Sequence, residues 1–300
     1  MNLKKKTRKR TRKFEIDGVV VTTTTSKIIY GDEENQIGQE QTPEEFVDNL
    51  VQVFREVKNV LADDGTLWLN IGDSYYNYRP GKGQSYPKQS VSKTKQDLPD
   101  KCSKRGNKLE GLKEKDLIGI PWMLAFALRA DGWYLRQDII WHKPNPMPES
   151  VKDRCTKSHE YIFLLSKSKQ YYYNNEAIKE PAKDWGTRDR TKGKYHNAGT
   201  GLSPHTGLCK SYPTKNKRSV WSVTNKPYKG AHFAVYPPDL IEPCIKAGSE
   251  KGDIILDPFM GSGTTARVAR SLSRDYIGCE LHKDYRDLIE IPSLDGLIEK

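Results

Sequence analysis

The sequence predicts an α/β fold built around a parallel sheet, and two observations carry that prediction. Short apolar segments with the composition of buried strands alternate with segments whose apolar residues recur at helical spacing. Such alternation is typical of parallel strands joined by helices that cover the sheet. The segments with strand character are 16–21, 66–71, 133–141, 161–165, 253–257 and 275–281.

Helices are expected at 43–61, 117–130, 238–247 and 264–273. The first has the clearest start, because Thr42 can cap it, Pro43 suits its first turn and Glu45 completes a capping box. Turn pairs of the Asp-Gly type follow the first two helices and separate each from the next strand. Helix and strand therefore alternate in at least three successive units.

The charge of the chain is concentrated at one end. The sequence has 300 residues, 35% hydrophobic and 30% charged, with a net charge of +11. Residues 1–13 carry eight basic residues and no acid, so removing them leaves only +3. We interpret residues 1–13 as a flexible basic tail, either a solvated leader or an arm that contacts phosphate groups. A nuclear address is the less favoured alternative.

Several protein classes are excluded by what the sequence lacks. It has no run of 18 apolar residues, so we expect no membrane span, and no apolar stretch follows the basic start as in a secretory signal. The five cysteines are widely spaced and form no CxxC pair, which argues against a disulfide framework and a structural zinc site. We therefore expect a cytoplasmic protein with no bound metal.

Two polar stretches interrupt the alternation. Residues 79–116 and 181–229 are rich in Lys, Arg, Gly, Ser, Thr and Tyr, with little apolar periodicity. In α/β proteins such insertions leave the sheet as long loops or small subdomains, where binding specificity usually resides. The expected core therefore comprises residues 14–78, 117–180 and 230–300.

A glycine-containing loop joins the strand at 253–257 to the helix at 264–273. Gly261 and Gly263 allow a sharp turn and the close approach of a ligand, and the helix N-terminus beyond them offers free N–H groups. Glu280 ends the following strand, where a carboxylate can accept hydrogen bonds from ribose hydroxyls. The pattern indicates a site for a nucleoside-containing ligand.

Three interpretations of the loop compete: a turn without a ligand, a dinucleotide site, and a site for S-adenosylmethionine. Residues 261–266 fit the loose G-x-G-x-x-G/A pattern of dinucleotide sites. However, the loop lies only about 40 residues from the end of the sequence, too few for the βαβαβ half that such a site requires. A nicotinamide-dependent dehydrogenase is thus the least favoured alternative.

The loop sequence LDPFMGSGTT resembles the cofactor motif of the DNA amino-methyltransferases, which methylate exocyclic nitrogens of cytosine or adenine. Other segments that resemble this family are 65–74, 131–148, 158–166, 221–223 and 232–238. Their order, with the cofactor motif last, is similar to that of the β-ordered class. The resemblance covers roughly residues 30–78 and 117–290.

The resemblance implies a Rossmann-like methyltransferase sheet with inserted target-recognition loops. It also implies S-adenosylmethionine as methyl donor and double-stranded DNA as substrate, methylated at cytosine N4 or adenine N6 within a specific sequence. A cognate restriction endonuclease is an implied partner, in a bacterial or phage-infected cell. The residues implied at the cofactor are Asp257, Pro258, Phe259, Gly261, Ser262, Gly263, Thr264, Thr265 and Glu280, with His232, Phe233 and Ala234.

The catalytic position departs from the family pattern. The family places a polar residue, two prolines and an aromatic residue after its first strand, so that the amine is oriented and the extruded base is stacked. In this chain the strand at 16–21 is followed by Thr22, Thr23, Thr24 and Thr25. A threonine hydroxyl can supply one acceptor, but it supplies neither the proline geometry nor the stacking ring.

Two explanations of the threonine run remain open. In the first, the motif is lost and the protein is a catalytically silent binder of cofactor or DNA. In the second, the reading frame is shifted over roughly the first 28 codons. Consecutive proline codons CCA read one base out of frame give ACC, which encodes threonine. The nucleotide sequence distinguishes the two, because only a frame shift leaves a Pro-Pro-aromatic motif in another frame upstream of codon 30.

The second insertion carries the expected DNA contacts. Lysine and arginine neutralise phosphates, and arginine reads guanine edges. The residues selected are Arg188, Arg190, Lys215, Lys217 and Arg218. The alternative is a solvated charged loop without a ligand.

Three further polar positions lie near strand ends. Asp73 follows the strand at 66–71, where it either faces the pocket or acts as a capping or turn carboxylate. We interpret His142 as a hydrogen-bonded surface residue and His159 as structural.

Overall fold

A computed structural model describes residues 36–77, 109–182, 212–225 and 236–281 in full. In addition it describes the backbone of strands β1 (Lys13–Ile16), β2 (Val19–Thr22), β3 (Lys27–Tyr30), β8 (Arg188–Asp189) and β9 (Leu208–Cys209). Within this part of the chain no helix is long and apolar enough to cross a membrane.

The helices begin and end close to the predicted positions. They are α1 (Pro43–Val60), α2 (Ile120–Ala130), α3 (Pro238–Gly248) and α4 (Thr264–Ser271), with a 3-10 turn at Glu176–Ile178. The Thr42 hydroxyl caps α1 by accepting a hydrogen bond from the Glu45 N–H at 3.2 Å. The Glu45 carboxylate reaches back to the N–H of Gln41, one residue before the cap, at 3.1 Å. Helix α2 starts three residues later than predicted, because Gly119 adopts φ +86° immediately before it.

Two sheets carry the fold, and one of them is mixed rather than parallel. The larger has the order β11 (Val220–Ser222), β5 (Tyr134–His142), β6 (His159–Ser166), β4 (Thr66–Ile71). Strand β6 runs antiparallel to both β5 and β4, and β11 runs parallel to β5. The predicted α/β fold is confirmed, but this sheet is mixed and not parallel as expected. The segment between β5 and β6 contains no helix, so β6 returns alongside β5 in the opposite direction.

The smaller sheet is parallel and holds the predicted glycine loop. Its order is β12 (Ile254–Asp257), β13 (Asp275–Glu280), β3, with Lys27 opposite Ile277. The strand predicted at 16–21 is instead divided between β1 and β2, which pair antiparallel with each other. The Asp17-Gly18 pair between them is a hairpin signal that explains the division. Among the described residues, β4 pairs only with β6 and β12 only with β13.

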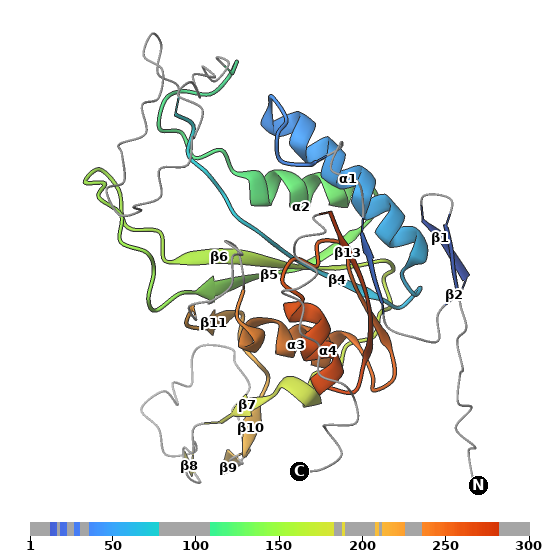
Figure 1. The fold of residues 1–300 in the computed structure, drawn as a ribbon. Helices are drawn as coiled ribbons and strands as arrows, with labels where there is room; N and C mark the ends of the chain where they lie inside the picture. The colour runs from blue at the N-terminus through green and yellow to red at the C-terminus, as the bar shows by residue number, and fades with distance from the viewer. Residues whose placement is uncertain are drawn as a thin grey trace, which may run out of the picture.

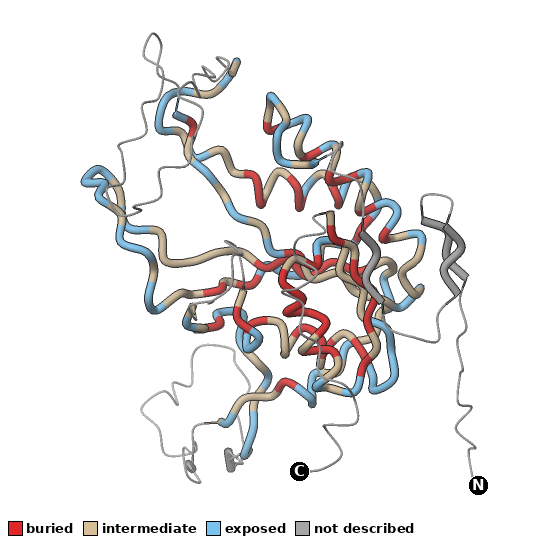
Figure 2. The backbone as a smooth tube through the Cα atoms, in the orientation of Figure 1, coloured by how far each residue is buried: buried red, intermediate tan, exposed pale blue. Residues whose placement is uncertain are grey.

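The core lies on both faces of the larger sheet (Figures 1 and 2). Successive side chains of a strand point to opposite faces, and β6 is buried on both. On one face, Phe163 and Leu165 pack with α1 and α2. On the other face, Ile162 packs with Trp221 of β11 and Leu240 of α3. A third cluster between α4 and β13 includes Met260, Ala266, Val268, Ala269 and Tyr276. Burial on both faces explains why β6 reads as a continuous apolar run.

The insertion at 181–229 contains short strands rather than loops alone. Strand β7 (Glu180–Pro181) pairs antiparallel with β10 (Thr214–Lys215), and β8 pairs antiparallel with β9. The division into a core and two insertions remains a prediction, since residues 78–108 and much of 183–211 lie outside the described residues.

Candidate functional site

The loop between β12 and α4 has the backbone that its glycines predicted. Gly261 has φ +54° and Gly263 has φ +78°, a region that side-chain-bearing residues rarely adopt. Gly263 directly precedes α4, and the Gly263 N–H donates to the Met260 carbonyl at 3.0 Å. Ser262, Thr264 and Thr265 are buried where the helix begins. The turn therefore presents the N-terminus of α4 beside the end of β12.

The Asp257 carboxylate organises this loop from within. Its Oδ1 accepts the N–H of Phe259 at 2.9 Å. Its Oδ2 accepts the hydroxyl of Tyr236 at 3.1 Å and also the hydroxyl of Thr265. The carboxylate thus joins the start of α3, the end of β12 and the first turn of α4.

Glu280 lies under the same loop. Its side chain is buried at the end of β13, and its Oε2 accepts the N–H of Gly261 at 2.6 Å. The N–H of Met260 donates to the carbonyl of Cys279 at 2.8 Å, so the loop rests on the end of this strand. Gly278 permits the contact, because a Cβ added there would lie 2.2 Å from Cε of Met260. Sequence reasoning missed Gly278, and it selected the segment 232–238 without foreseeing that Tyr236 bonds to Asp257.

The donor set at this site suits a nucleoside attached to an amino acid. A buried carboxylate at the end of β13 can accept ribose hydroxyls, and the N-terminus of α4 favours a carboxylate group. Phe259, within the loop, is half exposed and contacts Phe54 edge to face, with ring centroids 6.4 Å apart. A ribose acceptor at one strand end and a helix N-terminus nearby suit the ribose and the amino-acid carboxylate of S-adenosylmethionine.

Several predicted site residues cannot be placed beside this loop. His232, Phe233, Ala234, Thr23, Thr24, Thr25 and Arg190 lie outside the described residues. Thr22 ends β2, opposite Lys13 in the hairpin, and Arg188 lies in β8, opposite Cys209. For these two only the backbone is described.

Three of the predicted DNA contacts converge on one carboxylate. Lys215, Lys217 and Arg218 lie 3.8, 3.9 and 3.5 Å from the oxygens of Glu180. Glu180 and Lys217 are each 22% exposed in their side chains, and Nζ of Lys217 also lies 5.0 Å from the centre of the Trp221 ring. Part of this positive charge is therefore neutralised within the protein, which the sequence did not indicate.

Asp73 acts as the capping carboxylate. Its Oδ1 accepts the N–H groups of Gly119 and Ile120 at 2.9 and 3.1 Å, and that of Ser74 at 2.9 Å. Two of these donors stand at the start of α2, where negative charge is favourable. The side chain therefore fixes α2 to the end of β4.

Polar side chains also lie close together at the end of β5 and the start of β6. Nδ1 of His142 lies 3.0 Å from the Ser222 hydroxyl, so His142 is hydrogen-bonded as predicted. Glu160 forms an ion pair with Lys143 and accepts a hydrogen bond from Asn70 at 3.1 Å. These contacts tie neighbouring strands together at the carboxyl end of β5.

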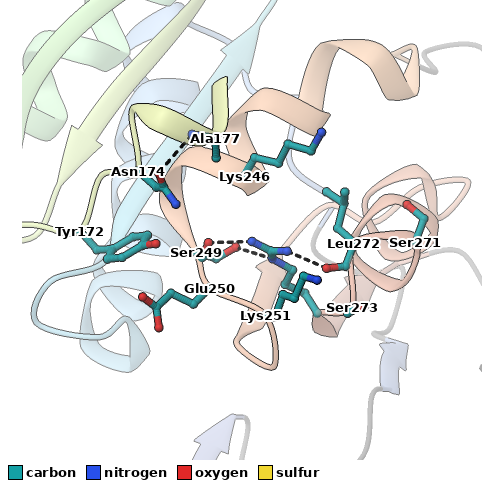
Figure 3. A pocket seen from close by; sticks show the side chains of 11 residues that line it. Tyr172, Asn174, Ala177, Lys246, Ser249, Glu250, Lys251, Ser271, Leu272 and Ser273 are labelled. Atoms are coloured by element: carbon teal, nitrogen blue, oxygen red, sulfur yellow. Dashed lines mark hydrogen bonds between the residues drawn. The ribbon is translucent and has the colours of Figure 1, made fainter. Parts of the chain in front are cut away.

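A cavity of about 500 Å³ lies near the start of β12 and β13, at the end opposite the glycine loop (Figure 3). Arg274 is buried in its wall and donates to the hydroxyl and carbonyl oxygens of Ser249 at 3.1 and 2.8 Å. It also donates to the carbonyl of Leu272 at 2.6 Å. Since Ser249 and Leu272 follow the last turns of α3 and α4, the guanidinium caps both helix ends. Its bonds are those of a structural residue.

Comparison with known proteins shows the family to which the chain belongs. A family model described as DNA methylase, of the N6/N4 type, matches residues 9–290, beginning earlier than the segments that carried the resemblance. The type II methyltransferase M.XycI of Xanthomonas campestris pv. cyanopsidis is 47% identical over 256 residues, covering 85% of this chain and 73% of the relative. M.Cfr9I of Citrobacter freundii is 46% identical over 259 residues, covering 86% and 74%. M.SmaI of Serratia marcescens is 47% identical over 258 residues, covering 84% and 75%.

Solved structures show the same fold. The cytosine-N4-specific PvuII DNA methyltransferase superposes with a TM-score of 0.55 at 14% identity, covering 92% of this chain and 84% of that one. A Thermus thermophilus protein described as a putative DNA modification methylase, complexed with S-adenosyl-L-methionine, gives 0.50 at 20% identity, covering 88% and 83%. The chain therefore belongs to the N6/N4 DNA methylase family and is an S-adenosylmethionine-dependent DNA methyltransferase of the type II restriction–modification kind.

Proposed function

We propose that residues 257–265 and Glu280 bind S-adenosylmethionine in this methyltransferase, and that the accepting atom is N4 of cytosine or N6 of adenine. The observation that carries the proposal is the buried Glu280 carboxylate, held against the glycine loop by Gly261. S-adenosylmethionine supplies a methyl group on a sulfonium. The chain orients it: Glu280 would accept the ribose hydroxyls, and the first turn of α4 would face the amino-acid end.

The accepting base must leave the duplex before its amine can align with the methyl group. We propose that residues 22–25 orient this amine, with a threonine hydroxyl as hydrogen-bond acceptor. Segment 181–229 would contact the target DNA through its lysine and arginine side chains. A cognate restriction endonuclease that recognises the same sequence would be the functional partner, as implied by the type II relatives.

A second candidate, the silent binder, is favoured by the N-terminal segment. Thr22 ends a strand whose described partner is β1, not a strand of the sheet that carries the cofactor loop. The threonine run also lacks the ring that would stack on an extruded base. Under this alternative the protein binds cofactor or DNA without turnover.

Transfer of tritiated methyl from S-adenosylmethionine to unmethylated duplex DNA tests the proposal, with calorimetric binding of S-adenosylmethionine measured alongside. Glu280→Gln should raise the Kd for the cofactor roughly tenfold or more, because a hydrogen bond to a charged acceptor contributes about 1.5–3 kcal/mol. Glu176→Gln, a surface carboxylate paired with Lys179, is the control.

Each outcome decides between the alternatives. Transfer by the wild-type chain, with the label recovered as N4-methylcytosine or N6-methyladenine, supports the proposal, whereas label on cytosine C5 contradicts the amine assignment. Cofactor binding without transfer supports the silent binder. An unchanged Kd in Glu280→Gln overturns the proposed cofactor site.

A further inference from the structure

We propose that Tyr236 is a positioning residue of the cofactor loop: its hydroxyl fixes the Asp257 carboxylate and thereby sets the affinity for S-adenosylmethionine. The inference rests on the proposed assignment of residues 257–265 as the cofactor site. It concerns a residue that does not itself belong to that loop.

The hydroxyl of Tyr236 stands between two residues of the site. It lies 3.1 Å from Oδ2 of Asp257 and 2.6 Å from Oγ1 of Thr265, and the Thr265 hydroxyl contacts the same Oδ2. The two hydroxyl oxygens and Oδ2 of Asp257 therefore form a closed triangle of three contacts. This triangle joins the start of α3 to both ends of the loop.

The phenol is suited to act as a permanent donor. Burial raises its pKa well above the ordinary value for tyrosine, and the nearby negative charge of Asp257 raises it further. The hydroxyl therefore stays protonated at neutral pH and keeps a proton to donate to Oδ2 of Asp257.

The ring that carries the hydroxyl is firmly held. Tyr236 packs against the cluster that contains Trp221, Leu240 and Cys244. Pro237 and Pro238 follow it, and their fixed φ angles restrict the direction in which the chain enters α3. The core therefore fixes the position of the Tyr236 hydroxyl, and through it the position of Oδ2 of Asp257.

The effect on the loop passes through the other oxygen of Asp257. Oδ1 accepts the N–H of Phe259, the second residue of the loop, at 2.9 Å. Rotation of the carboxylate would break this bond, and the hydroxyl of Tyr236 opposes that rotation. Removal of the hydroxyl should therefore loosen residues 258–263 and weaken cofactor binding, while leaving the methyl-transfer step nearly unchanged.

Tyr236→Phe tests the inference, because the ring and its packing are retained. We expect the Kd and the KM for S-adenosylmethionine to rise about fivefold to tenfold, less than for direct loss of one hydrogen bond to a charged group, because the hydroxyl acts on the cofactor only through the loop. The KM for DNA and kcat should change less than twofold. Hydrogen exchange without cofactor should be faster in residues 258–263 only. Tyr173→Phe, which changes a ring stacked on Trp68, is the matched control.

A second pair of variants separates positioning from packing. Thr265→Ser keeps a hydroxyl in the triangle and should raise the cofactor Kd less than Thr265→Val, which should resemble Tyr236→Phe. The double variant of Tyr236→Phe and Thr265→Val should weaken binding by less than the product of the two single effects, since both act on one oxygen.

An unchanged cofactor Kd in Tyr236→Phe, or an equal rise in the KM for both substrates with faster exchange throughout the protein, would overturn the inference. The cofactor Kd serves as the readout even in a protein without turnover. Failure of the underlying site assignment gives a different result, because Glu280→Gln would then also leave the Kd unchanged.

Discussion

Gly278 shows how one residue without a side chain determines where the loop rests. Cγ and Cβ of Met260 lie 3.0 and 3.1 Å from the position of a Cβ at Gly278, in addition to the closer Cε. Met260 is 2% exposed, so its side chain has little room to move away. The requirement for glycine comes from contact between residues in different elements, which no local pattern reveals.

Gly278→Ala should therefore displace Met260 and lift the loop from the end of β13. We expect the free energy of unfolding to fall by about 1–3 kcal/mol, as for other overpacked sites, and cofactor affinity to fall with it. Urea denaturation and calorimetry measure the two effects. Gly72→Ala is the control, since a Cβ at Gly72 would meet no atom within 4 Å. Equal stability of the two variants would contradict the proposed contact.

The elements differ in how far the sequence determined them. Helix α1 starts at the predicted residue, Pro43, because its cap, its proline and its capping carboxylate are local signals. The direction of β6 was not predicted, because an apolar strand has the same composition in either direction. Direction depends on the connection that precedes the strand, and residues 143–158 contain no helix to carry the chain back.

The sequence likewise predicted only part of the candidate site. The glycine loop and Glu280 were identified from the sequence, since strand, turn and helix succeed one another there. The carboxylate of Glu180 was missed, because it meets Lys215 and Arg218 only through the pairing of β7 with β10. The segment that contains Tyr236 was selected, but the bonds of Tyr236 were not predicted, because its partners are 21 and 29 residues away.

Asp73 should contribute to the stability of α2 from outside the helix. Asp73→Ala removes the acceptor of three N–H groups, and we expect the free energy of unfolding to fall by roughly 1–2 kcal/mol. Asp73→Asn retains a neutral acceptor and should fall between this variant and wild type. Thermal denaturation followed by circular dichroism checks the order. Asp48→Ala, at an exposed position of α1, should have little effect; a loss there as large as that in Asp73→Ala would contradict the assignment.

The pairing of β7 with β10 brings Glu180 close to three cationic side chains and so should reduce the positive charge available to DNA. Replacement of Lys215, Lys217 and Arg218 by alanine should weaken DNA binding and flatten its salt dependence, by about 0.9 in the logarithmic slope for each phosphate that the protein no longer neutralises. Glu180→Gln should have the opposite effect, since it releases the three cations from their shared partner. Affinities measured at two salt concentrations test both variants. If neither changes the slope, these residues do not contact phosphates.

At the scale of the whole molecule, Cys244 reports on global unfolding. It is buried in the cluster between the larger sheet and α3, and burial raises the pKa of its thiol well above the ordinary value. Because only the thiolate reacts with alkylating agents, Cys244 should react only when the fold opens. Cys155 is exposed.

Alkylation with iodoacetamide, followed by mass spectrometry, should therefore modify Cys155 in native buffer and Cys244 only as urea unfolds the chain. In a Cys155→Ser variant the rate at Cys244 should follow the unfolded fraction measured by circular dichroism. Reaction of Cys244 in native buffer at the rate of Cys155 would show that α3 detaches without global unfolding.

The pairing of β3 with β13 has a consequence for how the protein is made. Lys27 stands opposite Ile277, so this ladder closes a loop of about 250 residues. Contacts at such separation form slowly, because the entropy of closure is lost before any bond compensates for it. At 5–20 residues per second, a ribosome needs at least about 12 seconds to synthesise the intervening chain. During that time β3 has no partner, because the glycine loop and β13 have not yet been made. The nascent chain therefore acquires its cofactor site only after Glu280 has been added.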